Sequence, residues 1–87
     1  MRRWVDHVSF QIGDLVTIGY RRKFPVVLRS GPGYSYYRTD VLEPGQLAII
    51  IKQKTKLNDQ NWLCVFNTSL NAGWILESIV DHIEFFE

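Results

Sequence analysis

The sequence predicts an all-β fold, a small barrel of five to seven short antiparallel strands. Helical periodicity is nearly absent from the 87 residues, and apolar residues occur instead in short runs bounded by Gly, Pro, Asn and Asp. Short strands at this spacing are typical of small barrels and sandwiches. A chain of this length forms one domain, so residues 1–87 are taken as a single unit.

The strands and turns can be assigned in order along the chain. Gly13-Asp14 is expected to bend the first strand region, and Pro44-Gly45 is expected to form a tight turn. The strongest strand is expected around the three consecutive isoleucines at 49–51. Strands are expected at residues 10–20, 26–28, 46–52, 62–66, 72–76 and 79–86. Turns or polar loops are expected at residues 21–23, 30–40, 54–61 and 67–71.

The composition limits the class of protein. The single cysteine, Cys64, excludes an internal disulfide framework and a cysteine-based zinc cluster. A net charge of +1 gives no general case for nucleic acid. The N-terminal residues lack the apolar run of a signal peptide, and no segment approaches the roughly 20 apolar residues of a membrane helix. We therefore expect a cytoplasmic protein without a membrane partner and without a cofactor.

Four short motifs occur in a fixed order within residues 26–80. They are Arg29-Ser30-Gly31-Pro32, then Gly45 in a turn, then Trp62 with Val65 three residues later, and finally Gly73-Trp74-Ile75. In this order the motifs resemble the bacterial SH3-type (SH3b-like) domain, an SH3-like barrel. The resemblance implies that residues 26–80 form the barrel core and residues 81–87 a C-terminal strand. Residues 1–25 would then be an extension, either a strand or hairpin covering a barrel edge or a partner-binding segment.

Aromatic residues near the long loop form the candidate ligand-binding surface. Trp62 and Val65 lie three apart on an expected strand, so their side chains point to opposite faces. Val65 is expected in the core and Trp62 on an outer surface. The resemblance implies a ligand groove where such a Trp lies beside the loop, although one or two of the aromatics could instead pack over the core. The candidate groove residues are Tyr34, Tyr36, Tyr37, Trp62 and Trp74.

The end of the motif region departs from the SH3 domains that bind proline-rich peptides. Those domains carry a Pro and a Tyr where this chain has Leu76 and Ile79. The loop also lacks an acidic cluster, since it holds Arg38 and only Asp40. A basic proline-rich ligand is therefore not expected. Bacterial relatives often bind cell-wall peptides, so binding of such peptides is a further alternative.

A basic turn supports the alternative of a nucleic-acid-binding barrel. Arg21, Arg22 and Lys23 are consecutive, and Arg2 and Arg3 lie near the N-terminus. Such side chains could contact phosphates or an acidic partner. A run of charges in a turn is also commonly just solvated. Clustering of the basic side chains on one face of the fold would favour the nucleic-acid hypothesis.

Two similar patterns lie near the ends of the chain. Val-Asp-His-Val-Ser-Phe begins at residue 5, and Val-Asp-His-Ile-Glu-Phe begins at residue 80. The resemblance implies that the first and last strands are neighbours, in which case two Asp-His pairs could converge on a zinc or nickel ion. The residues concerned are Asp6, His7, Asp81 and His82. Because a short strand pattern also recurs by chance, no metal site is predicted.

The sequence offers little support for catalysis. Ser, His and Asp do not occur in a recognisable nucleophile context, and Cys64 lies in mid-strand as an expected core residue. Gly31-Pro32-Gly33 is followed by tyrosines rather than by a Lys and a helix, so it is not a phosphate loop. We therefore expect a non-enzymatic module that binds a protein or peptide. An accessory or structural protein of a phage, located in the virion, would fit this expectation, and a homo-oligomer is left open.

Overall fold

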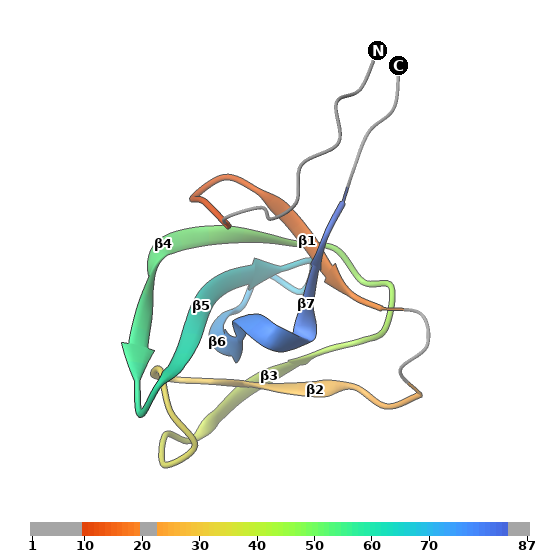
Figure 1. Cartoon of the computed structure of the whole chain (residues 1–87). Helices are drawn as coiled ribbons and strands as arrows, with labels where there is room; N and C mark the ends of the chain where they lie inside the picture. The colour runs from red at the N-terminus through yellow and green to blue at the C-terminus, as the bar shows by residue number, and fades with distance from the viewer. Residues whose placement is uncertain (1–9, 20–22, 84–87) are drawn as a thin grey trace.

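The computed structural model describes residues 10–19 and 23–83, and these residues form a small all-β domain (Figure 1). The strands are β1 (Leu15–Ile18), β2 (Val26–Arg29), β3 (Arg38–Leu42), β4 (Ala48–Leu57), β5 (Gln60–Asn67), β6 (Ala72–Leu76) and β7 (Val80–His82). A 3₁₀ turn, η1 (Glu77–Ile79), joins β6 to β7. The predicted fold class, all-β with five to seven short antiparallel strands, is confirmed.

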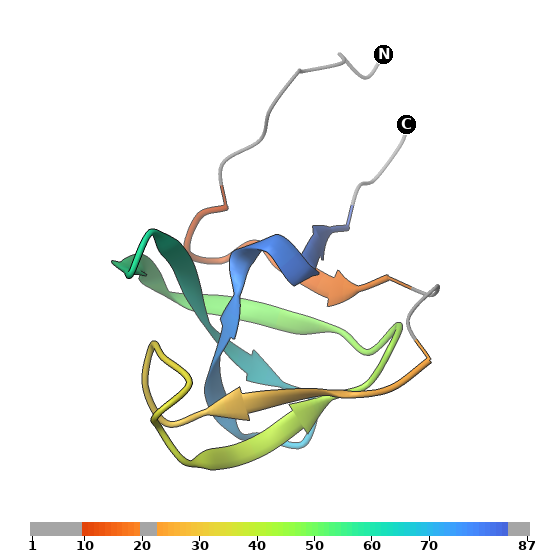
Figure 2. The same ribbon diagram turned by 60° about the horizontal axis from the view of Figure 1, so that its bottom comes forward.

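The seven strands form one antiparallel sheet that curls into a half-barrel (Figures 1 and 2). Their order across the sheet is β3-β2-β6-β5-β4-β1-β7. The first and last strands are neighbours, with Val16 opposite His82, as was expected for the two ends of the chain. On the other side of the sheet, β2 pairs with β6 through Arg29 and Trp74.

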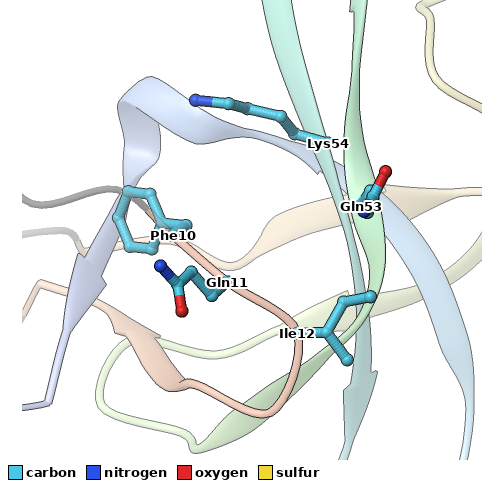
Figure 3. A pocket seen from close by; sticks show the side chains of 5 residues that line it. All are labelled: Phe10, Gln11, Ile12, Gln53 and Lys54. Atoms are coloured by element: carbon cyan, nitrogen blue, oxygen red, sulfur yellow. The ribbon is translucent and has the colours of Figure 1, made fainter.

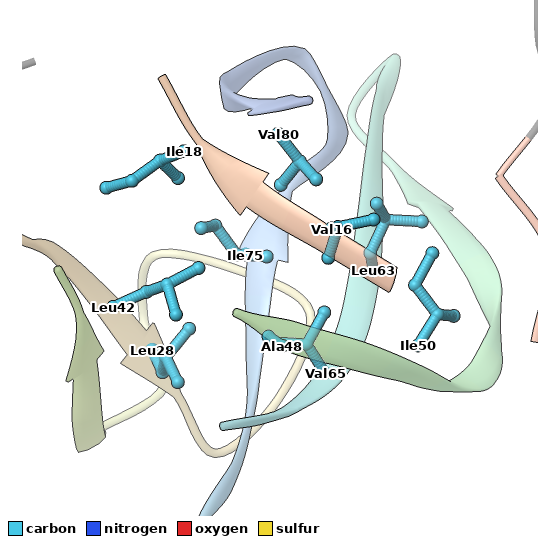
Figure 4. Close-up of a cluster of buried hydrophobic side chains, with 10 residues drawn as sticks. All are labelled: Val16, Ile18, Leu28, Leu42, Ala48, Ile50, Leu63, Val65, Ile75 and Val80. Atoms are coloured by element: carbon cyan, nitrogen blue, oxygen red, sulfur yellow. The ribbon is translucent and has the colours of Figure 1, made fainter. Parts of the chain in front are cut away.

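One apolar core fills the inside of the curl, and every strand contributes to it (Figure 4). Its buried members are Val16, Ile18, Leu28, Leu42, Ala48, Ile50, Leu63, Val65, Ile75 and Val80. Side chains alternate along each strand, so Leu63 and Val65 point inward from β5 while their neighbours point outward. Fully burying one such side chain stabilises the fold by about 1.5–3 kcal/mol. Packing therefore holds this domain together.

β1 is part of the barrel wall. It lies between β4 and β7, and Val16 and Ile18 are fully buried in the core. The strand predicted within residues 1–25 is thus present. It was expected to be an extension outside the barrel core, but it is one of the strands that enclose the core. Gly13, with a φ of 94°, makes the predicted bend before β1. Its N–H donates to the carbonyl of Ile50 over 2.8 Å, which ties the bend to β4.

β4 is longer than the sequence predicts, because it continues into the segment 54–61 that was expected to be a loop. A two-residue turn at Asn58 and Asp59 connects it to β5, closing on the pair Leu57 and Gln60. Both turn residues have positive φ, 52° and 62°, as in a type I′ hairpin, and Asn and Asp tolerate this conformation. The outer half of β4 is exposed and polar, so it carries no hydrophobic alternation that could predict a strand.

β3 begins at Arg38, within the segment 30–40 that was expected to be a loop. The register against β2 shifts between Leu28 and Arg29, which marks a bulge. Thr39 Oγ1 donates to the carbonyls of Leu28 at 3.3 Å and Ala72 at 3.0 Å. Polar side chains thus fix the start of this strand, where the sequence shows no apolar run.

Two glycines predicted from the motifs are required by the barrel. Gly45 has a φ of 82°, and its N–H donates to the carbonyl of Ile18 over 3.0 Å. At Gly73 an added Cβ would lie 2.5 Å from the Cβ of Leu28, so only glycine fits between β6 and β2. The tight turn and the close backbone approach expected at these positions are both confirmed.

The closing segment differs from the single strand expected at 79–86. The chain first makes the turn η1, which ends at Ile79, and β7 then covers three residues, Val80–His82. Val80 is buried and Asp81 is exposed, which is the alternation expected there. Residues 84–86 lie outside the described ranges.

Candidate functional site

The loop between β2 and β3, residues 30–37, folds back on itself (Figure 2). The N–H of Ser30 donates to the carbonyl of Tyr37 over 2.8 Å, which closes the loop. The ring of Tyr36 lies over Gly31, where an added Cβ would be 2.4 Å from ring carbons. Tyr36 and Gly31 therefore shape this loop, which we call the aromatic loop.

Arg29, the last residue of β2, holds the aromatic loop in place. Its Nη1 donates to the carbonyls of Tyr34 at 3.3 Å and Tyr36 at 3.0 Å. Its guanidinium carbon lies 5.7 Å from the centroid of the Tyr34 ring, within the range of a cation–π contact. Arg29 was not among the predicted site residues. Its position directly before Ser30-Gly31 in the first motif is the sequence signal that points to it.

Trp62, at the start of β5, lies under Tyr34. The two ring centroids are 5.2 Å apart and the ring planes make an angle of 79°, an edge-to-face contact. Trp62 is only 3% exposed, whereas Tyr34 is 60% exposed. The prediction that Trp62 lies on an outer surface is therefore wrong, because the aromatic loop covers it. Val65 lies in the core on the opposite side of β5, as predicted.

A hollow opens between β2 and β6, beside the Tyr34–Trp62 pair. Its volume is about 210 Å³. It is lined by Val26, Val27, Arg29, Tyr34, Trp62, Ile75, Leu76 and Ile79. Apolar side chains dominate this lining, and Arg29 is its one charged member. We call it the β2–β6 hollow.

The structure brings together only part of the predicted aromatic groove. Tyr34 and Trp62 line the β2–β6 hollow. The ring of Tyr36 packs over Gly31 within the aromatic loop and does not line the hollow. Tyr37 is 74% exposed and does not line it either. Trp74 is half-buried on the outward side of β6, where it is paired with Cys64 of β5. It does not line the hollow either. The lining residues that were not among the predicted site residues are Arg29 and the aliphatic side chains of β2, β6 and η1.

A second, wider hollow lies between the segment before β1 and the middle of β4 (Figure 3). Its volume is about 520 Å³, and Phe10, Gln11 and Ile12 face Gln53 and Lys54 across it. Three of the five lining residues carry flexible polar side chains. None of the residues predicted to bind a ligand lies in this hollow, so the β2–β6 hollow is the better candidate.

Of the residues considered for a metal site, His82 and Asp81 are described, and His82 has another partner. His82 Nε2 lies 3.1 Å from Oδ2 of Asp14, and its ring stacks on Phe10 with centroids 4.0 Å apart. Asp81 is exposed on β7. In residues 10–19 and 23–83, no group of three His, Cys, Asp or Glu side chains could hold a metal ion. Asp6 and His7 lie outside the described residues.

The basic turn proposed for nucleic acid is described only at Lys23, which is exposed. Arg2, Arg3, Arg21 and Arg22 lie outside the described residues. That site therefore stays a prediction.

The far end of β5 holds a closed polar network. Asn67 is buried, and its Nδ2 donates to Oδ2 of Asp40 over 2.8 Å. Asn71 Nδ2 donates to the same oxygen over 2.9 Å, and the N–H of Val41 donates to Oδ1 over 2.8 Å. These hydrogen bonds, that from Asn67 first, hold the pKa of Asp40 below its ordinary value. The hydrogen bonds of this carboxylate thus connect β3 to the β5–β6 turn.

Cys64, on the outward side of β5, is a buried thiol. Burial raises its pKa, and the nearby charge of Lys52 offsets this effect in part. A buried thiol with a raised pKa is a poor nucleophile. Cys64 therefore acts in packing.

Comparison with known proteins does not extend this description. Searches against protein-family models, curated proteins and solved structures each find no match. No helix within the described part of the chain has the length and apolar character needed to span a membrane. The inference of function therefore depends on the geometry of the site.

Proposed function

We propose that this half-barrel is a non-enzymatic, SH3-like interaction module that binds an extended segment of a protein partner at the β2–β6 hollow. The observation that carries the proposal is the convergence of Tyr34, Trp62 and aliphatic side chains of β2, β6 and η1 around one hollow. Aromatic and aliphatic anchors in such a pocket are typical of peptide-binding surfaces.

The size of the hollow supports a peptide over a small molecule. Its volume of about 210 Å³ is below the range of roughly 300–1,000 Å³ that is usual for small-molecule sites. One or two side chains of a peptide would fill it. Tyr34 adds an exposed, amphipathic ring at the rim, held by Arg29 and by the edge-to-face contact with Trp62.

A selection from a library of random peptides against the full chain tests this function. A selected peptide should lose about tenfold in affinity for Tyr34→Ser, because the rim of the hollow is removed. Tyr37→Ser is the matched control, because it deletes another exposed ring of the same loop, one that does not line the hollow. Its affinity should change less than about twofold.

The outcome against the proposal is also defined. If the library yields no specific peptide, or if Tyr34→Ser and Tyr37→Ser bind a selected peptide equally well, the hollow is not the binding site. Circular dichroism of both variants shows whether the fold is kept. Trp62→Ala is unsuitable here, because deleting a buried ring costs about 3–5 kcal/mol of stability and would mix folding with binding.

A further inference from the structure

A row of register-paired residues crosses the outward face of the sheet next to the β2–β6 hollow. Lys52 on β4 pairs with Cys64, Cys64 with Trp74, Trp74 with Arg29, and Arg29 with Arg38 on β3. Paired residues of antiparallel strands carry their side chains on the same face, and the register of the sheet shifts beside Lys52 and beside Arg29. At the usual strand spacing the row is about 19 Å long. We call these five residues the cationic row.

The positive charges of the cationic row have no carboxylate partner in the described part of the chain. The ion pairs found there join Lys54 to Glu77 and His82 to Asp14, and none of these residues belongs to the row. Arg29 and Arg38 are paired across β2 and β3, and like charges paired on neighbouring strands disfavour each other. An anionic partner would relieve this repulsion.

The closest candidate for an internal partner is already occupied. Asp40 lies two residues after Arg38 on β3, and the charge of Arg38 contributes to lowering the pKa of Asp40. Its two oxygens, however, accept hydrogen bonds from Asn67, Asn71 and the backbone of Val41. The carboxylate is thereby directed toward the β5–β6 turn.

The guanidinium of Arg29 is held ready for a ligand. Its Nη1 donates to the carbonyls of Tyr34 and Tyr36, which fix its orientation without neutralising its charge. Its other N–H groups have no hydrogen-bond partner among the described residues. A fixed guanidinium can offer two parallel donors to one carboxylate with little further loss of side-chain entropy. Because Arg29 also lines the hollow, such a carboxylate would lie beside a side chain bound there.

We propose that the segment bound at the β2–β6 hollow is acidic. An apolar side chain enters the hollow, an adjacent Asp or Glu pairs with Arg29, and further acidic residues lie along the cationic row. This inference rests on the proposed function and adds the charge of the partner. The charge is opposite to that of the basic proline-rich peptides bound by other SH3 domains. An acidic peptide fits better than a nucleic acid, because Arg29 adjoins a mostly apolar hollow of about 210 Å³, which is suited to an apolar side chain of the same segment.

The test uses peptides selected from the random library and synthesised in pairs, with the acidic residue or its amide. The selected sequences should place Asp or Glu next to an apolar residue. Replacing the acid by its amide should weaken binding to the wild-type chain about tenfold, and binding to Arg29→Gln less than about twofold. Raising the salt concentration should weaken only the acidic member of each pair.

Arg29→Gln also removes the hydrogen bonds that hold the aromatic loop, so a second pair of variants tests the charge without changing the loop. Arg38→Gln removes a charge of the cationic row that holds no loop carbonyl, and it should weaken the acidic peptide about threefold. Lys56→Gln removes another exposed charge, on β4 outside the row, and should change affinity less than about twofold.

Three results would overturn the inference. Equal binding of the acid and amide peptides would refute the acidic partner while leaving the proposed function intact. Failure to select any peptide would refute both the acidic partner and the proposed function. Tighter binding of a single-stranded oligonucleotide than of the acidic peptide, with the same dependence on Arg29 and Arg38, would assign the cationic row to nucleic acid instead.

Discussion

The two ends of β5 differ in how the charged group beside each of them is satisfied. At its end, Asn67 and Asn71 bind both to each other and to the carboxylate of Asp40, and the network is closed. Near its start, Trp62 lies under Tyr34 beside a hollow, and the partners of the Arg29 cation among the described residues are two neutral carbonyls and the Tyr34 ring. We refer to these as the closed end and the open end.

The comparison separates stability from recognition within one small domain. Groups at the closed end have their partners inside the chain, so changing them should reduce the free energy of unfolding. Groups at the open end keep donors and apolar surface for another molecule, so changing them should mainly reduce affinity. A buried polar network is stabilising only when every member is satisfied, as it is at the closed end.

The largest expected effect is that of Asn67→Ala. The change leaves the backbone N–H groups of Ser69 and Asn71 without their acceptor and Asp40 without its shortest side-chain donor. The free energy of unfolding should fall by about 2–4 kcal/mol. Urea denaturation followed by tryptophan fluorescence measures it. Ser69→Ala is the control, since only its backbone takes part, and a loss as large as that of Asn67→Ala would refute the closed network.

A smaller effect is expected from Gly31→Ala at the open end. The new methyl group would meet the ring of Tyr36, so the aromatic loop must shift, at a cost of about 1–3 kcal/mol. The affinity for a selected peptide should fall as well, because Tyr34 moves with the loop. In the double variant Gly31→Ala/Tyr36→Ala the space is restored. Its loss of stability should therefore be less than the sum of the two single losses, and strict additivity would contradict the contact.

The smallest expected effect is the pH dependence that Asp40 adds to stability. Its pKa is lowered in the folded chain, so its hydrogen bonds stabilise the fold above the ordinary pKa of 3.8. This contribution is lost as the pH falls through the lower folded pKa. Wild type should therefore be more stable than Asp40→Asn at neutral pH, and the difference should shrink below about pH 4. Denaturation series across this range measure it, and a difference that grows in acid would reverse the assigned sign.

Local chemistry made much of the fold predictable from the sequence. Gly45 has the positive φ of a tight turn, Gly73 lies where a close approach of two strands leaves no room for a side chain, and the motifs around them indicated both positions. The outer half of β4 could not be predicted as a strand, because the side chains there are mostly polar and the pairing depends on the hairpin turn at Asn58 and Asp59. β1 was found, but its place in the wall depends on pairing with β4 and β7, which are distant in sequence.

The candidate site was predictable only in part, for a similar reason. Tyr34 and Trp62 were identified, because aromatic residues beside a loop suggest an interface. The burial of Trp62 could not be read from the chain, since it follows from the way the aromatic loop folds over β5. The role of Arg29 depends on carbonyls that face it only in the folded loop. The parts of the candidate site that were not predicted are thus those that depend on how the aromatic loop folds.

Chemical-shift mapping of a selected acidic peptide on the ¹⁵N-labelled chain tests the central claim most directly. Binding at the open end predicts the largest shifts at the side-chain N–H groups of Trp62 and Arg29 and at the backbone of Tyr34. The side-chain amides of Asn67 and Asn71 should hardly move. Shifts centred on those amides, or on the wider hollow beside β1, would contradict the assignment of the open end as the binding site.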